Sequence, residues 1–441
     1  MNGRVDSPSE GIPPTVTPLS HFAESIGQNL SILDDYYHGA CQAPPSFQAC
    51  SAADVLPKDA PLEVKEARAS AMDQSLEVFE VLSGPTKVLS NLTIAYQTIA
   101  ALRWLCHFNV LRLVPEQGSI TFAELAQRAN VSEAALKTVA RMAMTAHLLH
   151  EPEPETLAHT AASKAIAESQ PFHDWAVHIA KEAIHIAMSM VEATERWHDS
   201  TKTTETPFNI ALDTELPFFE HLQKRPDHMK IYVGYQKAVA STEGLALQHI
   251  IRGYDWAALG RATVVDVGGS VGMASITLAE AFPDLNFIVQ ELPDGVRDGK
   301  EYIASVRKPE SVTSRIQYQA HDFFQEQPIK GAEVYLLRMI LHYWSLEHSV
   351  KTLRALIPAL EAGKSRIIVM DTVLPAPGSI SNVMERQLRV RDLAMMQLHG
   401  SHERNPEDWN AIFKAADERF EIKSMNMPFG SELAVIEVVL A

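Results

Sequence analysis

The spacing of apolar residues changes near Ala262, and this change predicts two kinds of structure in one chain. Before it, apolar positions recur at helical spacing, for example over 21–37 and 62–82. After it, short β-branched runs alternate with helical segments, which predicts a parallel, doubly wound sheet. The predicted strands are 263–269, 286–292, 315–321, 334–341 and 365–374. The predicted helices between and after them are 273–282, 294–307, 346–360, 382–398 and 407–416. Two final apolar runs, 420–427 and 433–440, predict a closing hairpin-like pair of strands.

Residues 87–150 show the order helix, turn, helix, with Ser119 or Thr121 and then Ser132 as N-terminal caps. This is the layout of a winged helix, and we expect 159–163 to close its wing. A winged helix serves either DNA binding or packing between subunits. The second helix, within 132–146, has one Lys and one Arg in fifteen residues. Because phosphate contacts need clustered basic residues, the pattern favours packing.

The composition narrows the classes of partner. The formal net charge of −17 disfavours nucleic acid. Three cysteines, without metal-ligand spacing, indicate neither a disulfide framework nor a metal site and favour the cytoplasm. No apolar run approaches the ~20 residues that cross a bilayer, and the polar N-terminus does not resemble a signal peptide. We therefore expect no membrane partner, and we expect 1–20 to be a disordered tail.

The most informative local pattern is Val-Val-Asp-Val-Gly-Gly-Ser-Val-Gly at 264–272, where a buried strand meets a helix. The glycines Gly268, Gly269 and Gly272 allow the backbone to approach a ligand closely, although such turns also simply end strands. Glu291 ends the next strand, nineteen residues after Gly272. An acid at that place can accept hydrogen bonds from both ribose hydroxyls, so the pattern predicts an adenosine site.

Three features favour S-adenosylmethionine over a nicotinamide nucleotide. The spacing is G-G-x-x-G and not the G-x-G-x-x-G of pyrophosphate sites. Asp266, two residues before Gly268, suits a sulfonium-bearing methionine tail better than a diphosphate. No Arg beside Glu291 could take a 2′-phosphate. Asp322 and Phe323 follow the third strand, where they can meet an adenine edge and face.

His342 is the candidate catalytic residue, because it follows the fourth strand at the edge of the sheet where ligands bind. Its imidazole could accept a proton from a phenol near neutral pH. A base histidine needs an orienting acid, which Asp371, at the end of the fifth strand, or Glu403 could supply. The alternatives are a purely structural histidine and a Glu403 that caps a helix or pairs with Arg404.

Several motifs in order resemble the S-adenosylmethionine-dependent O-methyltransferases of the caffeic-acid type, and the fungal secondary-metabolism branch most closely. The motifs that resemble the family are VVDVGGSVG, FIVQELPDGV, HDFF, LRMILHYWS, MDTVLP and SHERNPEDWNAIFKAADERF. The similarity to the fungal branch rests on LRALIPAL, ADERF and the closing GSELAVIEVVL. The resemblance covers about 350 residues, because the segment 87–163 is similar to the family's dimerisation domain. It implies a homodimer that methylates a small-molecule acceptor.

The resemblance also implies roles for individual residues. The general base falls on His342, with Asp371 and Glu403 as its acidic partners, and a substrate-clamping methionine falls on Met395. The implied cofactor contacts are Asp266, Gly268, Gly269, Gly272, Glu291, Asp322, Phe323 and Arg338. Three positions depart from the family pattern: Tyr343 and Glu291 stand where Asp is usual, and Ser270 occupies the third position of the glycine-rich segment.

These interpretations give four units and one acceptor pocket. The units are a tail and N-terminal arm at 1–62, a winged-helix dimerisation domain at 63–165, a helical pocket region at 166–250 and a Rossmann-like catalytic domain at 251–441. The expected pocket residues are Met188, Phe219, Met229, Tyr235, Met395, Met396 and His399. Methionines adapt to many shapes, so they indicate a flat apolar phenol, such as a polyketide, without naming one.

Two rival functions share these features. Some fungal proteins of this fold bind S-adenosylmethionine but catalyse dehydration or pericyclic ring formation without moving a methyl group. The retained His342 argues against that class, while Tyr343 keeps it open. The second rival is a non-enzymatic winged-helix regulator. The acidic net charge and the retained His342, Asp371 and Glu403 argue against it.

Overall fold

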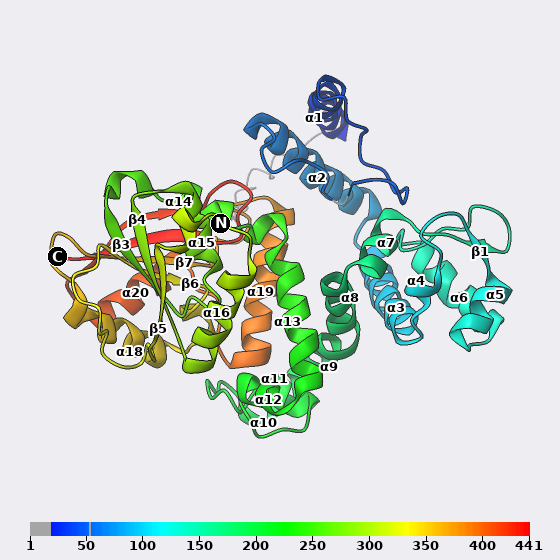
Figure 1. The fold of residues 1–441 in the computed structure, drawn as a ribbon. Coiled ribbons are helices and arrows are strands. Elements are labelled where there is room, and N and C mark those ends of the chain that lie inside the picture. The colour runs from blue at the N-terminus through cyan, green and yellow to red at the C-terminus, as the bar shows by residue number, and fades with distance from the viewer. Residues whose placement is uncertain (1–18, 53) are drawn as a thin grey trace, which may run out of the picture.

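The computed structural model describes residues 19–52 and 54–441. The predicted disordered tail falls almost entirely on residues outside these ranges, and α1 (Leu19–Gly39) includes its last two positions. α1 packs against α2 (Leu62–Ser83), and Figure 1 shows this pair projecting from the rest of the molecule. Across the described residues, we find no helix with the length and apolar character needed to cross a membrane.

The predicted winged-helix region contains α3 (Lys87–His107), α4 (Val110–Leu113), α5 (Phe122–Ala129) and α6 (Glu133–Met144). Thr121 and Ser132 cap α5 and α6 by accepting hydrogen bonds from Glu124 N and Ala135 N. β1 (Ile120–Thr121) pairs antiparallel with β2 (Thr156–Leu157), and His150 bridges to Ala158. The expectation that 159–163 closes the wing is therefore wrong: Thr160 and Ser163 form the capping box that starts the next helix.

The middle of the chain is helical, but in shorter pieces than the pattern predicted. Its elements are α7 (Ala161–Glu168), α8 (Gln170–Val177), the π-helical η1 (His178–Ala183), α9 (Ile184–Met188), α10 (Met190–Trp197), α11 (Pro207–Ala211), α12 (Phe218–Lys224), α13 (Pro226–Ala240), η2 (Glu243–Leu245), α14 (Gln248–Gly253) and η3 (Trp256–Leu259). Prolines at the starts of α8, α11 and α13 explain several of these breaks, because proline fits the first helical turn but not a helix interior.

The remaining strands form one seven-stranded sheet in the order β5-β4-β3-β6-β7-β9-β8. They are β3 (Ala262–Val267), β4 (Leu285–Glu291), β5 (Ile316–Ala320), β6 (Val334–Arg338), β7 (Arg366–Asp371), β8 (Phe420–Asn426) and β9 (Ala434–Leu440). The first five in spatial order are parallel, and β9 lies antiparallel between β7 and β8. The predicted Rossmann-like fold with a closing antiparallel pair is confirmed.

Helices cover both faces of this sheet (Figure 1). Val265, Val267 and their neighbours pack under α18 (Leu346–Leu356) and α20 (Pro406–Ala416), while Val264 faces α14 and α15 (Met273–Ala281). The other elements are α16 (Pro293–Ser305), α17 (Glu310–Thr313), η4 (Leu341–Tyr343), η5 (Ile357–Ala359) and α19 (Asn382–His399). Strand order reverses between β3 and β6, and ligands of such sheets bind at the carboxyl ends of the strands there.

Candidate active site

The glycine-rich segment forms a tight turn between β3 and α15. Gly268 and Gly272 have φ of +71° and +84°, and Ser270 also has positive φ, at +52°. A Cβ on Gly268 would lie 2.7 Å from Ile340 Cδ1, and one on Gly269 would lie 2.6 Å from the carboxyl carbon of Asp266. Only glycine fits both places without a shift of neighbouring atoms, so the turn depends on glycine at these positions.

Asp266 lies beneath this turn and is 1% exposed. Its Oδ2 accepts a hydrogen bond of 2.6 Å from the Ser275 hydroxyl, and burial raises its pKa to about 6. Arg338, at the end of β6, is close enough to attract this carboxylate, although burial lowers the pKa of the guanidinium. Its Nη2 donates to Leu245 O at 3.3 Å, and its Nε has no partner among the described residues.

Glu291, Asp322 and Phe323 lie at the same edge of the sheet, because β4 lies between β3 and β5. Glu291 Oε1 accepts from Leu292 N at 2.9 Å, and Asp322 Oδ1 accepts from Phe324 N at 3.0 Å. The Phe323 ring lies 3.6 Å from the position of a Cβ on Gly268. The structure thus brings two carboxylates and an aromatic face to the glycine turn.

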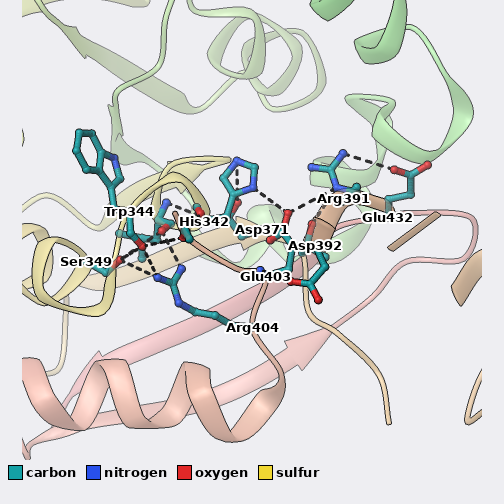
Figure 2. A network of polar contacts seen from close by, with 12 residues as sticks. His342, Trp344, Ser349, Asp371, Arg391, Asp392, Glu403, Arg404 and Glu432 are labelled. Atoms are coloured by element: carbon teal, nitrogen blue, oxygen red, sulfur yellow. Dashed lines mark hydrogen bonds and ion pairs between the residues drawn. The ribbon is translucent and has the colours of Figure 1, made fainter. Parts of the chain in front are cut away.

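The His342 side chain lies between two acids and is 1% exposed. Its Nδ1 is 3.0 Å from Glu403 Oε1, and its Nε2 is 3.9 Å from Asp371 Oδ1, beyond hydrogen-bond length (Figure 2). Burial raises the pKa of Asp371 to about 6. Burial would also raise the pKa of Glu403, but His342 and Arg391 outweigh it and lower that pKa. Glu403 therefore contacts the Nδ1 edge of the ring, while Nε2 has no hydrogen-bond partner among the described residues.

Backbone contacts fix the segment that carries His342. Arg404 is buried and donates to the carbonyl oxygens of Leu341 and Trp344, and Ser401 Oγ donates to His342 O (Figure 2). No ion pair forms between Arg404 and Glu403 among the described residues, so the suggested pairing of these neighbours is wrong. Glu403 N instead donates to Asp392 Oδ1, which orients the loop after α19.

Most of the expected acceptor residues gather beside His342. Phe219 stacks on His399 with ring centroids 5.3 Å apart, and Tyr343 lies 5.0 Å from His399 and 4.0 Å from His342. Met229 and Tyr235 pack in the adjoining cluster of α11 to α13. Met395 is 8% exposed. Burial, followed by the effect of His342, lowers the pKa of His399 to about 3, so its imidazole is neutral at physiological pH.

Two expected residues lie elsewhere. Met188 ends α9 with 69% of its surface exposed, outside the aromatic cluster. Met396 lines a separate cavity of about 290 Å³ between α10, the following loop and the opposite face of α19. Hydrophobic character selected both methionines but could not tell which side of a helix they occupy. The structure does not bring them together with the other expected pocket residues.

Arg391 was not among the site residues expected from the sequence. Its Nε donates to Thr372 Oγ1 at 3.1 Å, and its guanidinium reaches both Glu403 and Glu432 (Figure 2). One signal was available: Arg391 precedes Met395 by four residues, so both lie on the same face of α19.

Comparison with known proteins identifies the family of this fold and site. A family model described as an O-methyltransferase domain matches residues 198–418. The O-methyltransferase bik3 of Gibberella fujikuroi is 42% identical over 96% of this chain and 93% of its own length. The O-methyltransferase VdtC of Byssochlamys spectabilis is 42% identical over 96% of this chain and 98% of its own.

Two solved structures share the fold at low identity. OxaC aligns with a TM-score of 0.73 and 20% identity over 96% of this chain and 99% of its own. LepI, solved in complex with S-adenosylmethionine, aligns with a TM-score of 0.71 and 19% identity over 95% and 100%. The chain belongs to the S-adenosylmethionine-dependent O-methyltransferases, and both relatives at 42% identity carry the name O-methyltransferase.

Proposed function

We propose that this enzyme methylates a hydroxyl of a small aromatic or polyketide-like acceptor, with His342 as the general base. The observation that carries the proposal is the different surroundings of the two ring nitrogens. Nδ1 lies 3.0 Å from Glu403 Oε1, whereas Nε2 has no hydrogen-bond partner among the described residues. A carboxylate on one nitrogen leaves the other available to accept a proton. The neighbouring Phe219, Tyr343 and His399 rings suit a flat acceptor.

The residues around the glycine turn fit S-adenosylmethionine. The turn depends on glycine, because a Cβ on Gly268 would meet Ile340 and one on Gly269 would meet the Asp266 carboxylate, which lies beneath it. We assign Gly268, Gly269, Gly272 and Asp266 to the methionine and ribose side, Glu291 to the ribose hydroxyls, Asp322 and Phe323 to the adenine, and Arg338 to charge balance with Asp266. When bound, the cofactor supplies an electrophilic methyl group.

The chain's own groups then position the acceptor and move one proton. His342 Nε2 accepts the proton of the acceptor hydroxyl as that oxygen gains the methyl group, and the Glu403 carboxylate stabilises the resulting imidazolium. His342 is nearly fully buried, and the centroid of the Tyr343 ring lies 4.0 Å from that of its imidazole. These surroundings limit the access of water to the base.

Replacing Glu291 tests the cofactor assignment. We expect Glu291→Ala to weaken S-adenosylhomocysteine binding by about tenfold or more, because hydrogen bonds to a charged group contribute about 1.5–3 kcal/mol each. Titration calorimetry measures this loss, with Glu301→Ala, an exposed acid on α16, as the matched control. Equal affinity of Glu291→Ala and the unchanged protein would remove Glu291 from the site.

The product of the reaction distinguishes methyl transfer from a pericyclic reaction of the same fold. One structural relative with a TM-score of 0.71 is described as a pericyclic reaction enzyme. We expect each turnover with labelled cofactor and phenolic acceptors to yield one S-adenosylhomocysteine and one methylated product, visible by mass spectrometry. Conversion of an acceptor with full recovery of S-adenosylmethionine would overturn methyl transfer while leaving the cofactor site intact.

We also propose that the chain forms a homodimer through its N-terminal helices. Apolar side chains on α2 and α3 are strongly exposed, including Leu82 at 68%, Leu89 at 75% and Leu92 at 60%. Contiguous exposed apolar surface of this kind marks an interface. In this arrangement 63–165 acts in subunit packing, and 166–250 together with 251–441 builds the site.

We expect light scattering to give twice the chain mass at micromolar concentration. The double variant Leu89→Asp and Leu92→Asp should give the mass of one chain, because two buried charges destabilise an apolar interface. Val390→Asp, at an exposed position of α19, is the control. A monomeric unmodified protein would contradict the proposal.

A further inference from the structure

Arg391 places a positive charge in the wall of the proposed acceptor site. It lies on the same face of α19 as Met395, which follows it by one helical turn. Its guanidinium Nε is 3.9 Å from Glu403 Oε1, the oxygen that also contacts His342 (Figure 2). Burial raises the pKa values of Tyr235 and Tyr343, and the nearby Arg391 cation offsets part of that rise. Arg391 therefore lies among groups from α13, η4 and the loop after α19.

The described residues leave most N–H donors of the Arg391 guanidinium without a hydrogen-bond partner. Its hydrogen bond to the described residues runs from Nε to the neutral Thr372 hydroxyl. Glu432 Oε2 is 3.6 Å from Nη1, too far for a hydrogen bond, and burial raises the pKa of that carboxyl. Glu403 Oε1 is 3.9 Å away and is already held by His342 at 3.0 Å. Arginine carries five N–H donors, so most of them remain available to a ligand.

The Arg391 side chain is also partly exposed. Fifteen per cent of the Arg391 side chain is exposed, whereas the side chains of His342 and Glu403 are 1% and 0% exposed. An arginine that served only to neutralise the buried carboxylates would be expected to form short, bidentate hydrogen bonds with them, because charge-assisted pairs of this kind are the strongest. Arg391 instead combines one hydrogen bond, two long ion pairs and an open side.

We propose that Arg391 determines acceptor specificity by binding an anionic oxygen of the acceptor, distinct from the hydroxyl that His342 deprotonates. This inference rests on the proposed function of the site. The acceptor class it names is an acidic hydroxyaromatic, which carries a carboxylate or an ionised enolic oxygen beside the methylated hydroxyl. Planar guanidinium matches such oxygens bidentately, which gives direction as well as charge.

The test uses a matched pair of probes, 3-hydroxy-2-naphthoate and its methyl ester, titrated into the protein saturated with S-adenosylhomocysteine at pH 7.5. We expect the unmodified protein to bind the acid about tenfold more tightly than the ester, since a charged hydrogen bond contributes about 1.5–3 kcal/mol. Arg391→Met should abolish this preference, and Arg391→Lys should keep part of it. Arg386→Met, which removes an exposed arginine of the same helix that pairs with Glu80, should leave the preference unchanged.

Measuring the affinity for S-adenosylhomocysteine distinguishes a failure of this inference from a failure of the proposed function. Equal binding of acid and ester, no binding of the acid, or an unchanged preference in Arg391→Met would each overturn the inference while cofactor binding stays intact. Loss of S-adenosylhomocysteine binding in Arg391→Met alone would assign the cation to the cofactor and would also overturn it. Failure of the unmodified protein to bind S-adenosylhomocysteine would instead count against the proposed function on which the inference rests.

Discussion

Replacing His342 with alanine should reduce methyl transfer by about 10²–10⁴-fold, the usual contribution of a general base. S-adenosylhomocysteine affinity should stay nearly unchanged, because the imidazole lies between Asp371 and Glu403 and not at the glycine turn. Residual turnover should remain, since positioning of the two reactants also supplies rate. Single-turnover kinetics with a methylated-product readout measures the loss, and calorimetry measures the affinity.

A volume-preserving variant separates chemistry from packing. His342 is buried, so alanine leaves a cavity that could itself disturb the loop held by Arg404 and Ser401. His342→Gln fills most of that space but has no basic nitrogen, so its loss of rate should match that of alanine. His402→Ala, in the exposed neighbouring position, should retain full activity. Activity of His342→Gln within tenfold of the unmodified enzyme would remove the base role.

The fold was predictable because its signals are local and periodic. The change from helical spacing to alternating strands at Ala262 marks the start of β3, and Thr121 and Ser132 cap the helices that they precede in the sequence. The wing was misplaced because its strands are two residues long, too short to carry any periodicity. Its position depends on the His150–Ala158 bridge, a tertiary contact.

The candidate site was predictable only in part. His342 follows β6 and Asp371 ends β7, and because these strands are parallel neighbours, topology alone brings both residues to one edge. Glu403 is 61 residues from His342, and no local pattern joins them; the family resemblance supplied that position. Arg404 and Ser401 act on backbone carbonyl oxygens, which every residue carries, so sequence cannot name such partners. The orientation of Met188 and Met396 was equally invisible, because composition does not say which side of a helix faces the site.

Asp266 shows how a residue of the proposed cofactor site can lower the stability of the folded protein. Its folded pKa of about 6 exceeds the ordinary value of 3.8, so the native state keeps this proton to higher pH than the unfolded state does. The stability that this group contributes is therefore fully present below about pH 4 and is lost as pH rises through about 6. A difference of about 2 pKa units corresponds to about 3 kcal/mol at neutral pH. Asp371 has the same sign, with a pKa also near 6.

We expect Asp266→Asn to stabilise the ligand-free protein at pH 7.5 by up to about 3 kcal/mol, because asparagine is uncharged and its oxygen can still accept from Ser275. The gain should shrink by pH 5, where the aspartate of the unmodified protein is largely protonated. The same variant should lose S-adenosylhomocysteine affinity by more than about tenfold, because the ligand would lose a charged acceptor. Urea unfolding at both pH values and calorimetry measure the two effects, with the exposed Asp284→Asn as control. Lower stability at both pH values would show that the ionised carboxylate stabilises the turn, whereas greater stability with lost affinity would mean that the fold retains a buried charge for its ligand.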